Sequence, residues 1–208
     1  VNNGDTFLRV NTKAALIYLS ILTSKHDVVV CNPPYTDSAD FGPELKKFIE
    51  FNYKKPYKFH TNLYATFIKR CYEFTGDDSK IAMIHPRTFM YIKTFEEVRK
   101  FILTKTKVNL LAELGCGGVF EFTNVAVDAV MYIIEKQIVD KYGIYFDLKF
   151  YHNYTRKGKI FNGIYQNFVN NRKDKHVFIL EQSKLKVIKS WPFIYWISDE
   201  FREKFKEK

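Results

Sequence analysis

The chain has 208 residues, enough for one well-filled core or for one domain and part of another. Its hydrophobic content of 46% and charged content of 27% are ordinary for a globular protein, and no apolar run approaches the length of a membrane span. The formal net charge of +10 favours a polyanionic partner, although many basic proteins never bind nucleic acid. Composition therefore excludes a membrane-spanning chain and leaves a nucleic-acid partner open.

Three isolated cysteines, Cys31, Cys71 and Cys116, form no Cys-x-x-Cys pair. Such a scattered, odd set argues against a disulfide framework and for a reducing compartment, so we expect a cytoplasmic protein. The five histidines show no metal-binding spacing, and we expect no metal site. The first residues are not a signal peptide, and the start at Val1 without an initiator Met suggests a piece of a longer protein.

The first residues hold two elements whose form the sequence leaves open. Gly4 and Asp5 are typical of a turn before a strand. Residues 13–22 are apolar enough for a helix or a strand, and their periodicity does not decide between the two.

A short β-branched run, residues 27–31, breaks abruptly into Asn32-Pro33-Pro34-Tyr35. The run predicts a buried strand of an α/β sheet, and the prolines end it because they have no N–H to give a neighbouring strand. The result is a stiff loop at the carboxyl end of a parallel strand, where open α/β sheets bind their ligands.

The groups of this loop suit an exocyclic amine on a planar base. The side-chain oxygen of Asn32 and the carbonyl of Pro33 can both accept hydrogen bonds from the amine, and the ring of Tyr35 offers a flat apolar platform. The alternative is a purely structural role, as a proline-stiffened surface turn with a solvent-facing tyrosine.

The tetrapeptide resembles the signature of the amino-methyltransferases of DNA, in the Asn-Pro-Pro-Tyr form of the N6-adenine enzymes. The resemblance implies methyl transfer from S-adenosyl-L-methionine, with Asn32, Pro33, Pro34 and Tyr35 as catalytic residues. It also implies that Asn32 adjoins the cofactor and that Asp5, in a Gly-Asp-x-x-Leu segment, holds the cofactor's adenine amine. The turn described above is at least as good an interpretation of Asp5.

Further along the chain, helices and strands alternate. Residues 36–58 predict a basic active-site loop with a short helix over 44–51, and a merely solvated loop is the even alternative. The later pattern predicts a helix over 62–74 capped by Thr61 or Asn62, a strand over 80–85, a helix to Leu103 opened by a capping box at Thr94 and Glu97, and strands over 108–114 and 125–134.

This order indicates an α/β fold with a parallel sheet finished by an antiparallel hairpin. The resemblance makes it a Rossmann-like class I S-adenosylmethionine-dependent methyltransferase fold, of which the chain holds the C-terminal half of the sheet. Between the last two strands lies a glycine-rich loop whose spacing does not suit phosphate binding. The resemblance implies that Phe120 of this loop, rather than Phe122, stacks on a flipped base opposite Tyr35. The alternative is a phenylalanine that plugs the core.

After residue 137 the chain becomes rich in lysine and aromatic residues. We expect residues 1–137 to form the methyltransferase catalytic region, and residues 138–208 to form a basic linker and the start of a DNA target-recognition region. Candidate DNA contacts are Lys157, Lys159, Arg172 and Lys173. Residues 191–198 resemble the Pro-x-x-Tyr-Trp-x-Ser segment of the BREX phage-defence (PglX-type) methyltransferases.

The leading hypothesis is part of an adenine-specific DNA methyltransferase of a phage-defence or restriction-modification system. Its partners would be double-stranded DNA and, as an open question, other subunits of the defence system, with no membrane. No glycine-rich cofactor loop precedes the Asn-Pro-Pro-Tyr stretch, which supports the alternative of a non-catalytic DNA-binding subunit. Methylation of protein glutamine or of RNA adenine is a third hypothesis, and the basic, aromatic C-terminal region disfavours glutamine.

Overall fold

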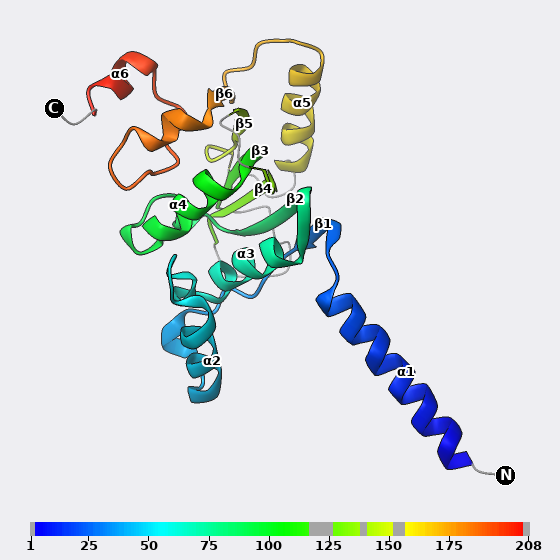
Figure 1. The fold of residues 1–208 in the computed structure, drawn as a ribbon. Coiled ribbons are helices and arrows are strands. Elements are labelled where there is room, and N and C mark those ends of the chain that lie inside the picture. The colour runs from blue at the N-terminus through cyan, green and yellow to red at the C-terminus, as the bar shows by residue number, and fades with distance from the viewer. Residues whose placement is uncertain (1–2, 117–126, 138–140, 152–156, 206–208) are drawn as a thin grey trace.

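A computed structural model describes residues 3–116, 127–137, 141–151 and 157–205, with only the backbone helix for residues 3–10. The strands are β1 His26–Cys31, β2 Thr75–Pro86, β3 Lys107–Gly115, β4 Ala129–Glu135, β5 Tyr142–Asp147 and β6 Val177–Glu181. The α-helices are α1 Asn3–Thr23, α2 Pro43–Tyr53, α3 Leu63–Phe74, α4 Glu96–Lys105, α5 Lys157–Val169 and α6 Asp199–Glu203 (Figure 1). Across these residues, no helix combines the length and the apolar character that crossing a membrane would need.

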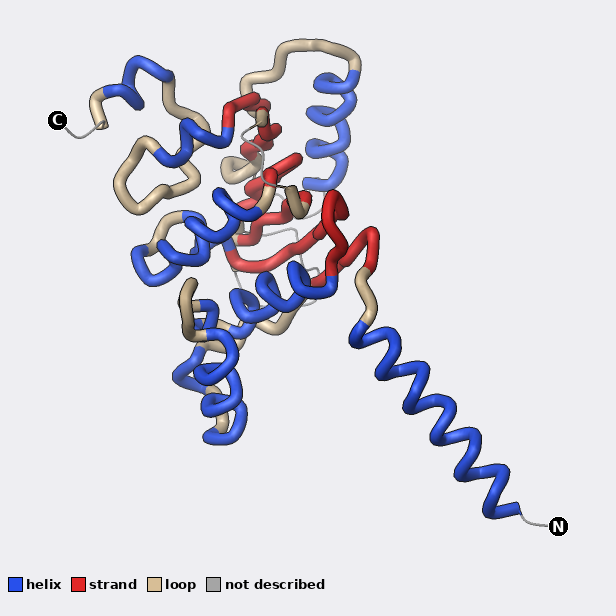
Figure 2. Tube along the Cα trace, viewed as in Figure 1, coloured by secondary structure: helices blue, strands red, loops and turns tan. Residues whose placement is uncertain are grey.

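The six strands form one sheet in the order β1-β2-β4-β3-β5-β6 (Figure 2). β1 pairs with β2 in parallel, and β3 pairs with β5 in parallel, while β4 is antiparallel to both β2 and β3. The strands β1, β2, β3 and β5 therefore run the same way. Their carboxyl ends lie along one edge of the sheet, together with the start of β4, and this edge carries the candidate site.

The sheet separates two apolar clusters because successive side chains of a strand point to opposite faces. On β3, Leu111 packs in the cluster shared with helices α3 and α4, whereas Ala112 packs in the cluster shared with α5. On β5, Tyr145 and Phe146 divide in the same way. Helices thus cover both faces, as the α/β pattern predicts, and the antiparallel pair β3–β4 confirms the predicted hairpin.

Two predictions for the start of the chain are wrong. β1 is half-exposed rather than buried, with Val28 61% and Val30 76% exposed, because it ends the sheet of the described residues. Gly4 and Asp5 lie within α1, which extends away from the sheet (Figure 1), so the predicted turn is absent. Residues 13–22, whose form the sequence left open, are helical.

The two predicted helix caps have opposite outcomes. Asn62 caps α3, because its backbone is extended and its side chain accepts a hydrogen bond from the N–H of Tyr64 at 3.1 Å. The capping box at Thr94 and Glu97 is wrong. Residues 93–95 already form a 3-10 turn, and this helical backbone at Thr94 cannot take the extended conformation of a capping residue.

The elements after residue 137 pack against those before it. β5 and β6 belong to the same sheet as the earlier strands, and Phe193 and Tyr195 are buried in the cluster under α4. A linker carries few contacts, whereas these elements complete the core. The division into a catalytic region and a target-recognition region at residue 137 stays a prediction.

Candidate active site

The Asn-Pro-Pro-Tyr loop follows β1 directly and lies at the carboxyl edge of the sheet. Pro33 is buried, Asn32 is exposed and Tyr35 is half-buried. The hydroxyl of Tyr35 donates a hydrogen bond to Oδ1 of Asn32 at 2.7 Å, and it lies 3.5 Å from the carbonyl of Ile84 on β2. The loop therefore presents an oriented amide to solvent while its first proline anchors it in the protein.

The start of α3 holds the other side of this loop. The backbone N–H of Leu63 donates to the carbonyl of Thr36 at 2.9 Å, and the side-chain amide of Asn62 donates to the carbonyl of Tyr35 at 3.4 Å. Asn62 thus caps the helix with its oxygen and contacts the loop with its nitrogen. Since prolines cannot donate backbone hydrogen bonds, these contacts supply the positioning that a strand ladder would otherwise give.

Below the loop, the end of β2 is fixed by an aromatic stack. Tyr64 is buried, and its ring stacks on the ring of His85 with centroids 4.6 Å apart. Nδ1 of His85 lies 2.9 Å from the carbonyl of Pro86, and Nε2 lies 2.8 Å from the hydroxyl of Tyr132. A carbonyl can only accept, so Nδ1 carries the proton. Burial lowers the pKa of His85 to about 4 and keeps the ring neutral.

Tyr35 remains a donor throughout the ordinary pH range. Burial, with a smaller contribution from nearby Cys31, raises the pKa of its hydroxyl. The oxygen of Asn32 has two lone pairs, and Tyr35 takes one of them. The second lone pair and the exposed position leave Asn32 able to accept a hydrogen bond from a ligand.

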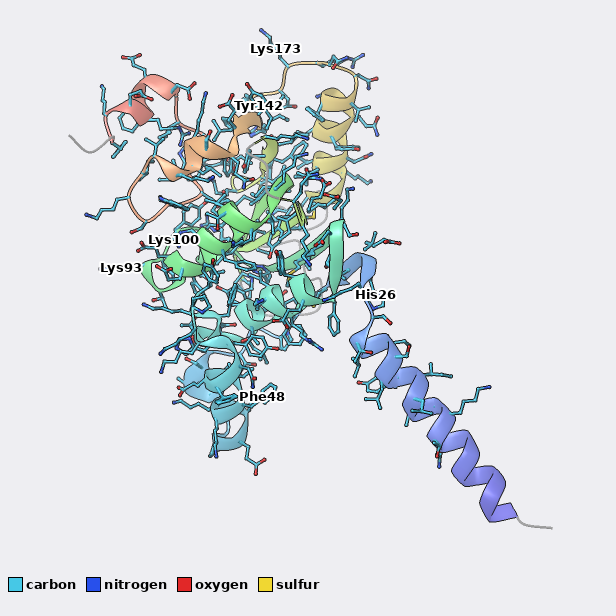
Figure 3. The ribbon with its side chains drawn as sticks, viewed as in Figure 1. His26, Phe48, Lys93, Lys100, Tyr142 and Lys173 are labelled. Carbon is cyan, nitrogen blue, oxygen red and sulfur yellow. The ribbon has the colours of Figure 1, made fainter. Side chains whose placement is uncertain are left out.

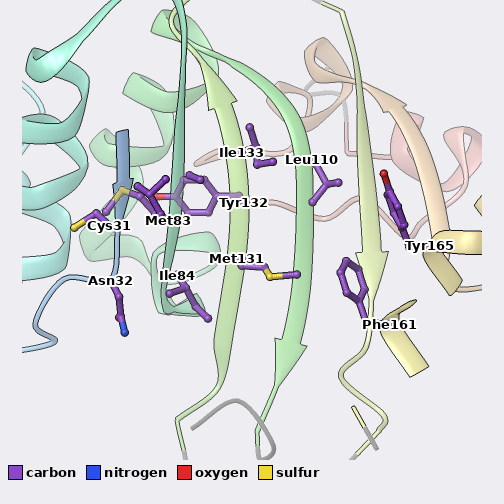
Figure 4. A pocket seen from close by; sticks show the side chains of 12 residues that line it. Cys31, Asn32, Met83, Ile84, Leu110, Met131, Tyr132, Ile133, Phe161 and Tyr165 are labelled. Atoms are coloured by element: carbon purple, nitrogen blue, oxygen red, sulfur yellow. The ribbon is translucent and has the colours of Figure 1, made fainter. Parts of the chain in front are cut away.

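Asn32 also lines a cavity of about 530 Å³ on the face of the sheet that α5 partly covers (Figure 4). Figure 4 shows Asn32, Ile84 and Met131 following one another along neighbouring strands, with Phe161 of α5 beyond them. The walls are mainly apolar, and no carboxylate is among the lining residues that the structure describes. The cavity therefore offers packing surface and the amide of Asn32, but no described carboxylate for the ribose hydroxyls or the ammonium of S-adenosylmethionine.

A second group of side chains at the same edge surrounds Glu113, near the end of β3. Its side chain is fully buried, and its two oxygens contact two cations and two phenols. One oxygen accepts from the guanidinium of Arg87 and from the hydroxyl of Tyr91 at 2.8 Å. The other accepts from Nζ of Lys149 at 3.1 Å and from the hydroxyl of Tyr195 at 2.8 Å. We call these five residues the Glu113 cluster.

Burial and charge shift the pKa values of three members of the Glu113 cluster, Arg87, Tyr91 and Tyr195. Burial opposes the charge of Arg87, but hydrogen bonds and charges from Glu113 and Asp128 outweigh it and raise the pKa of Arg87. Burial, and then the negative charge of Glu113, raise the pKa values of Tyr91 and Tyr195. Arg87 therefore stays charged, and the two phenols stay protonated as donors. We did not predict this cluster, although a glutamate inside the apolar run Leu-Leu-Ala-Glu-Leu is a signal for one.

The four basic candidates for DNA contact fall into two groups. Lys157 is buried at the start of α5, where its Nζ donates to the carbonyls of Leu114 and Cys116, so it fixes the end of β3 and presents no charge to solvent. Lys159, Arg172 and Lys173 are exposed. Arg172 and Lys173 lie on the segment between α5 and β6, where Figure 3 labels Lys173.

The remaining candidates are less defined. Asp5 lies in α1, and Phe120 and Phe122 lie outside the described residues. Within the described ranges, no group of three or more His, Cys, Asp or Glu side chains could hold a metal ion.

One protein-family model and two known proteins are similar to this chain. The model of the Eco57I restriction-modification methylase family matches residues 1–120. The adenine-specific methyltransferase PglX of Lacticaseibacillus casei (strain Zhang) is 26% identical over 178 residues, and BrxX of Escherichia coli O9:H4 (strain HS), also an adenine-specific methyltransferase, is 22% identical over 115. The alignments cover 85% and 55% of this chain but only 14% and 9% of those relatives.

Among solved structures, a chain of a type I restriction-modification system superposes with a TM-score of 0.60 at 15% identity. The match covers 85% of this chain and 37% of that one. At this identity the likeness shows a shared fold.

Proposed function

Since this chain belongs to the Eco57I restriction-modification methylase family, we propose that it is part of an enzyme that methylates the exocyclic amine of adenine in DNA. The observation that carries the proposal is the exposed Asn32 amide, oriented by Tyr35 and set after a buried proline at the carboxyl edge of the sheet. The adenine specificity of PglX and BrxX supports it. We place the enzyme in a restriction-modification or BREX-type defence system.

In this proposal the loop acts by orienting the amine. An adenine amine is a poor nucleophile because its lone pair is delocalised into the ring. Oδ1 of Asn32 and the carbonyl of Pro33 each accept a hydrogen bond from one N–H of the amine. These two bonds favour a nitrogen whose lone pair points out of the ring plane. S-adenosylmethionine, which the family implies, supplies the methyl group. The loop contributes position and preorganised acceptors, with no covalent enzyme intermediate.

The base would have to leave the duplex to reach this loop. We propose that Tyr35 stacks on the extruded base and that Phe120 stacks on its other face. Phosphates of the duplex would lie near Lys159, Arg172 and Lys173, because these side chains are exposed on α5 and on the segment that follows it. Lys157 is not among these contacts, because its ammonium is buried.

The test is Asn32→Ala in the complete protein, with Asn52→Ala as the matched control. Asn52 lies on α2, where its amide donates only to a carbonyl of the same helix. Losing one positioned acceptor should lower methyl transfer to DNA by about 10²- to 10³-fold, as for a lost oxyanion-hole donor, with DNA affinity nearly unchanged. The control should keep the wild-type rate. Wild-type methylation by the Asn32→Ala variant would exclude the proposed chemistry.

A non-catalytic DNA-binding subunit is the second candidate. It is favoured by one observation, the lack of a carboxylate among the described residues that line the cavity beside Asn32. Tritium transfer from labelled cofactor to DNA decides between the two. DNA binding without transfer by the complete wild-type protein supports the second candidate.

A further inference from the structure

A separate cavity of about 580 Å³ lies where β5 ends, and it shares no lining residue with the cavity beside Asn32. Its volume is in the range of pockets that hold a nucleotide-sized ligand. It is lined by aromatic and basic side chains with one carboxylate: Asp147, Lys149, Phe150, Tyr151, Lys175, His176, Phe178 and Trp196. Because β5 runs parallel to β1, this cavity opens on the same edge of the sheet as the Asn-Pro-Pro-Tyr loop.

Phe150 is displayed at the tip of a defined turn. The N–H of Tyr151 donates to the carbonyl of Leu148 at 3.1 Å, and the N–H of Lys149 donates to Oδ1 of Asp147 at 3.1 Å. These bonds hold the backbone on both sides of Phe150, yet its side chain is 72% exposed. A phenylalanine held in this way has apolar surface that no described residue covers.

The Glu113 cluster fixes the second aromatic wall. Nζ of Lys149 lies 4.0 Å from the ring centroid of Trp196, and it is held there by Glu113 at 3.1 Å and Asp147 at 3.3 Å. Trp196 is still 38% exposed. Since the charge of Lys149 is balanced by these carboxylates, Lys149 positions the tryptophan and contributes little net charge to the cavity.

Among the described lining residues of this cavity, the exposed cation is Lys175. Its side chain is exposed, and it follows Arg172 and Lys173 on the segment between α5 and β6. The backbone next to it is fixed, because Oδ1 of Asp174 accepts from the N–H of His176 at 3.0 Å. A cation therefore stands beside two exposed aromatic faces.

We propose that this cavity binds one unpaired nucleotide of DNA, with its base stacked on Phe150 or Trp196 and its phosphate beside Lys175. Aromatic platforms next to a basic side chain are how proteins bind single-stranded nucleic acid without reading its sequence. The proposal rests on the proposed function, because it assumes a DNA substrate. It adds a second site for a nucleotide other than the methylated adenine.

The test uses the complete protein and a fluorescein-labelled thymidylate 12-mer, followed by fluorescence anisotropy. This probe contains no adenine, so its binding is measured apart from methyl transfer. Phe150→Ala should weaken binding about tenfold, the usual loss for one base–aromatic stack. Lys175→Ala should weaken it less and reduce the salt dependence by about one phosphate contact.

Two matched controls come from the opposite edge of the sheet. Tyr142→Ala removes an exposed aromatic ring at the start of β5, and Lys80→Ala removes an exposed lysine of β2. Both should bind the 12-mer like the wild type. Replacing one thymine by 5-iodouracil should give a photocrosslink to the peptide that contains Phe150 or Trp196.

The outcomes separate this proposal from the proposed function. Unchanged binding by both Phe150→Ala and Lys175→Ala, in a protein that methylates adenine, overturns the second site alone. Loss of binding in those variants of a protein that transfers no methyl group supports the site and counts against the proposed enzyme. Crosslinks only to residues near Asn32 would show that the thymidylate enters the first site, and they would also overturn the proposal.

Discussion

The Asn-Pro-Pro-Tyr loop and the Glu113 cluster lie on the same edge of one sheet, but they are built in opposite ways. Asn32 is exposed, and its oxygen has a single described partner, the hydroxyl of Tyr35. Glu113 is fully buried and has four partners for two oxygens. One group keeps a lone pair for a ligand, whereas the other has no capacity left.

Because of this difference, we expect the side chains of Asn32 and Glu113 to have different roles. A buried carboxylate whose charge had no partner would destabilise the fold, so the partners of Glu113 must be in place before any ligand binds. The partners of Glu113 come from three segments: Arg87 and Tyr91 from the turn after β2, Lys149 from the turn after β5, and Tyr195 from near the end of the chain. The cluster therefore stabilises the edge on which the loop is presented, and the loop carries the chemistry that we propose.

The largest expected effect is that of Glu113→Ala on stability. Removing the carboxylate leaves Arg87 with Asp128 alone and Lys149 with Asp147 alone, and breaking such a buried pair typically costs about 3–5 kcal/mol in the free energy of unfolding. Glu135→Ala on neighbouring β4 is the control, because Glu135 mainly accepts from Asn109 at 2.8 Å and is half-exposed. Urea unfolding should show a loss below about 1 kcal/mol for the control. Equal losses for the two variants would mean that the cluster is not a special point of stability.

A second effect should appear when the pH is lowered. The pKa of His85 is about 4 in the fold and about 6.5 in an unfolded chain, so the unfolded state binds more protons between these values. Stability is therefore complete above pH 6.5 and falls as the pH drops to about 4, by about 3 kcal/mol. Below pH 4 the histidine contributes no further change.

A variant without an ionisable group at position 85 separates the contribution of His85 to the pH dependence of stability from that of the carboxylates. His85→Phe keeps a flat ring against Tyr64 but has no proton to bind. Its stability should be lower than that of the wild type at pH 7, with a smaller decrease between pH 6.5 and pH 4. Thermal unfolding at several pH values measures both. Parallel curves for the two proteins would show that His85 is not the group that titrates.

The sequence predicted those parts of this edge that depend on neighbouring residues. Pro33 and Pro34 end a strand by their own chemistry, and Asn62 caps a helix that begins at the next residue. The family match covers residues 1–120, which include this stretch, and the role of the stretch in methyl transfer stays a proposal. Local rules were sufficient because no distant contact was needed to define these elements.

The parts that the sequence did not predict depend on distant contacts. The partners of Glu113 lie 22 to 82 residues away along the chain, and no local pattern joins them. The exposure of β1 depends on which strands flank it, and a β-branched run is the same at the edge or the centre of a sheet. The membership of β5 and β6 in the sheet was missed for the same reason, since their patterns are short and weak.

The smallest expected effect concerns the link between Tyr35 and Asn32. Tyr35→Phe keeps the ring for stacking but removes the hydroxyl that donates to Oδ1 of Asn32 at 2.7 Å. The loss of this hydrogen bond should cost about 0.5–1.5 kcal/mol in stability, because Asn32 is exposed and water can replace the phenol. Methyl transfer should fall by up to about tenfold, because the amide loses its fixed orientation while both acceptors remain.

Tyr35→Ala should lose the stacking as well and bind an extruded base more weakly, by about 1–3 kcal/mol. A fluorescent adenine analogue at the target position reports that difference. If Tyr35→Phe and Tyr35→Ala change the signal equally, the hydroxyl rather than the ring holds the base, and the loop would then resemble the Glu113 cluster in acting through fixed polar contacts.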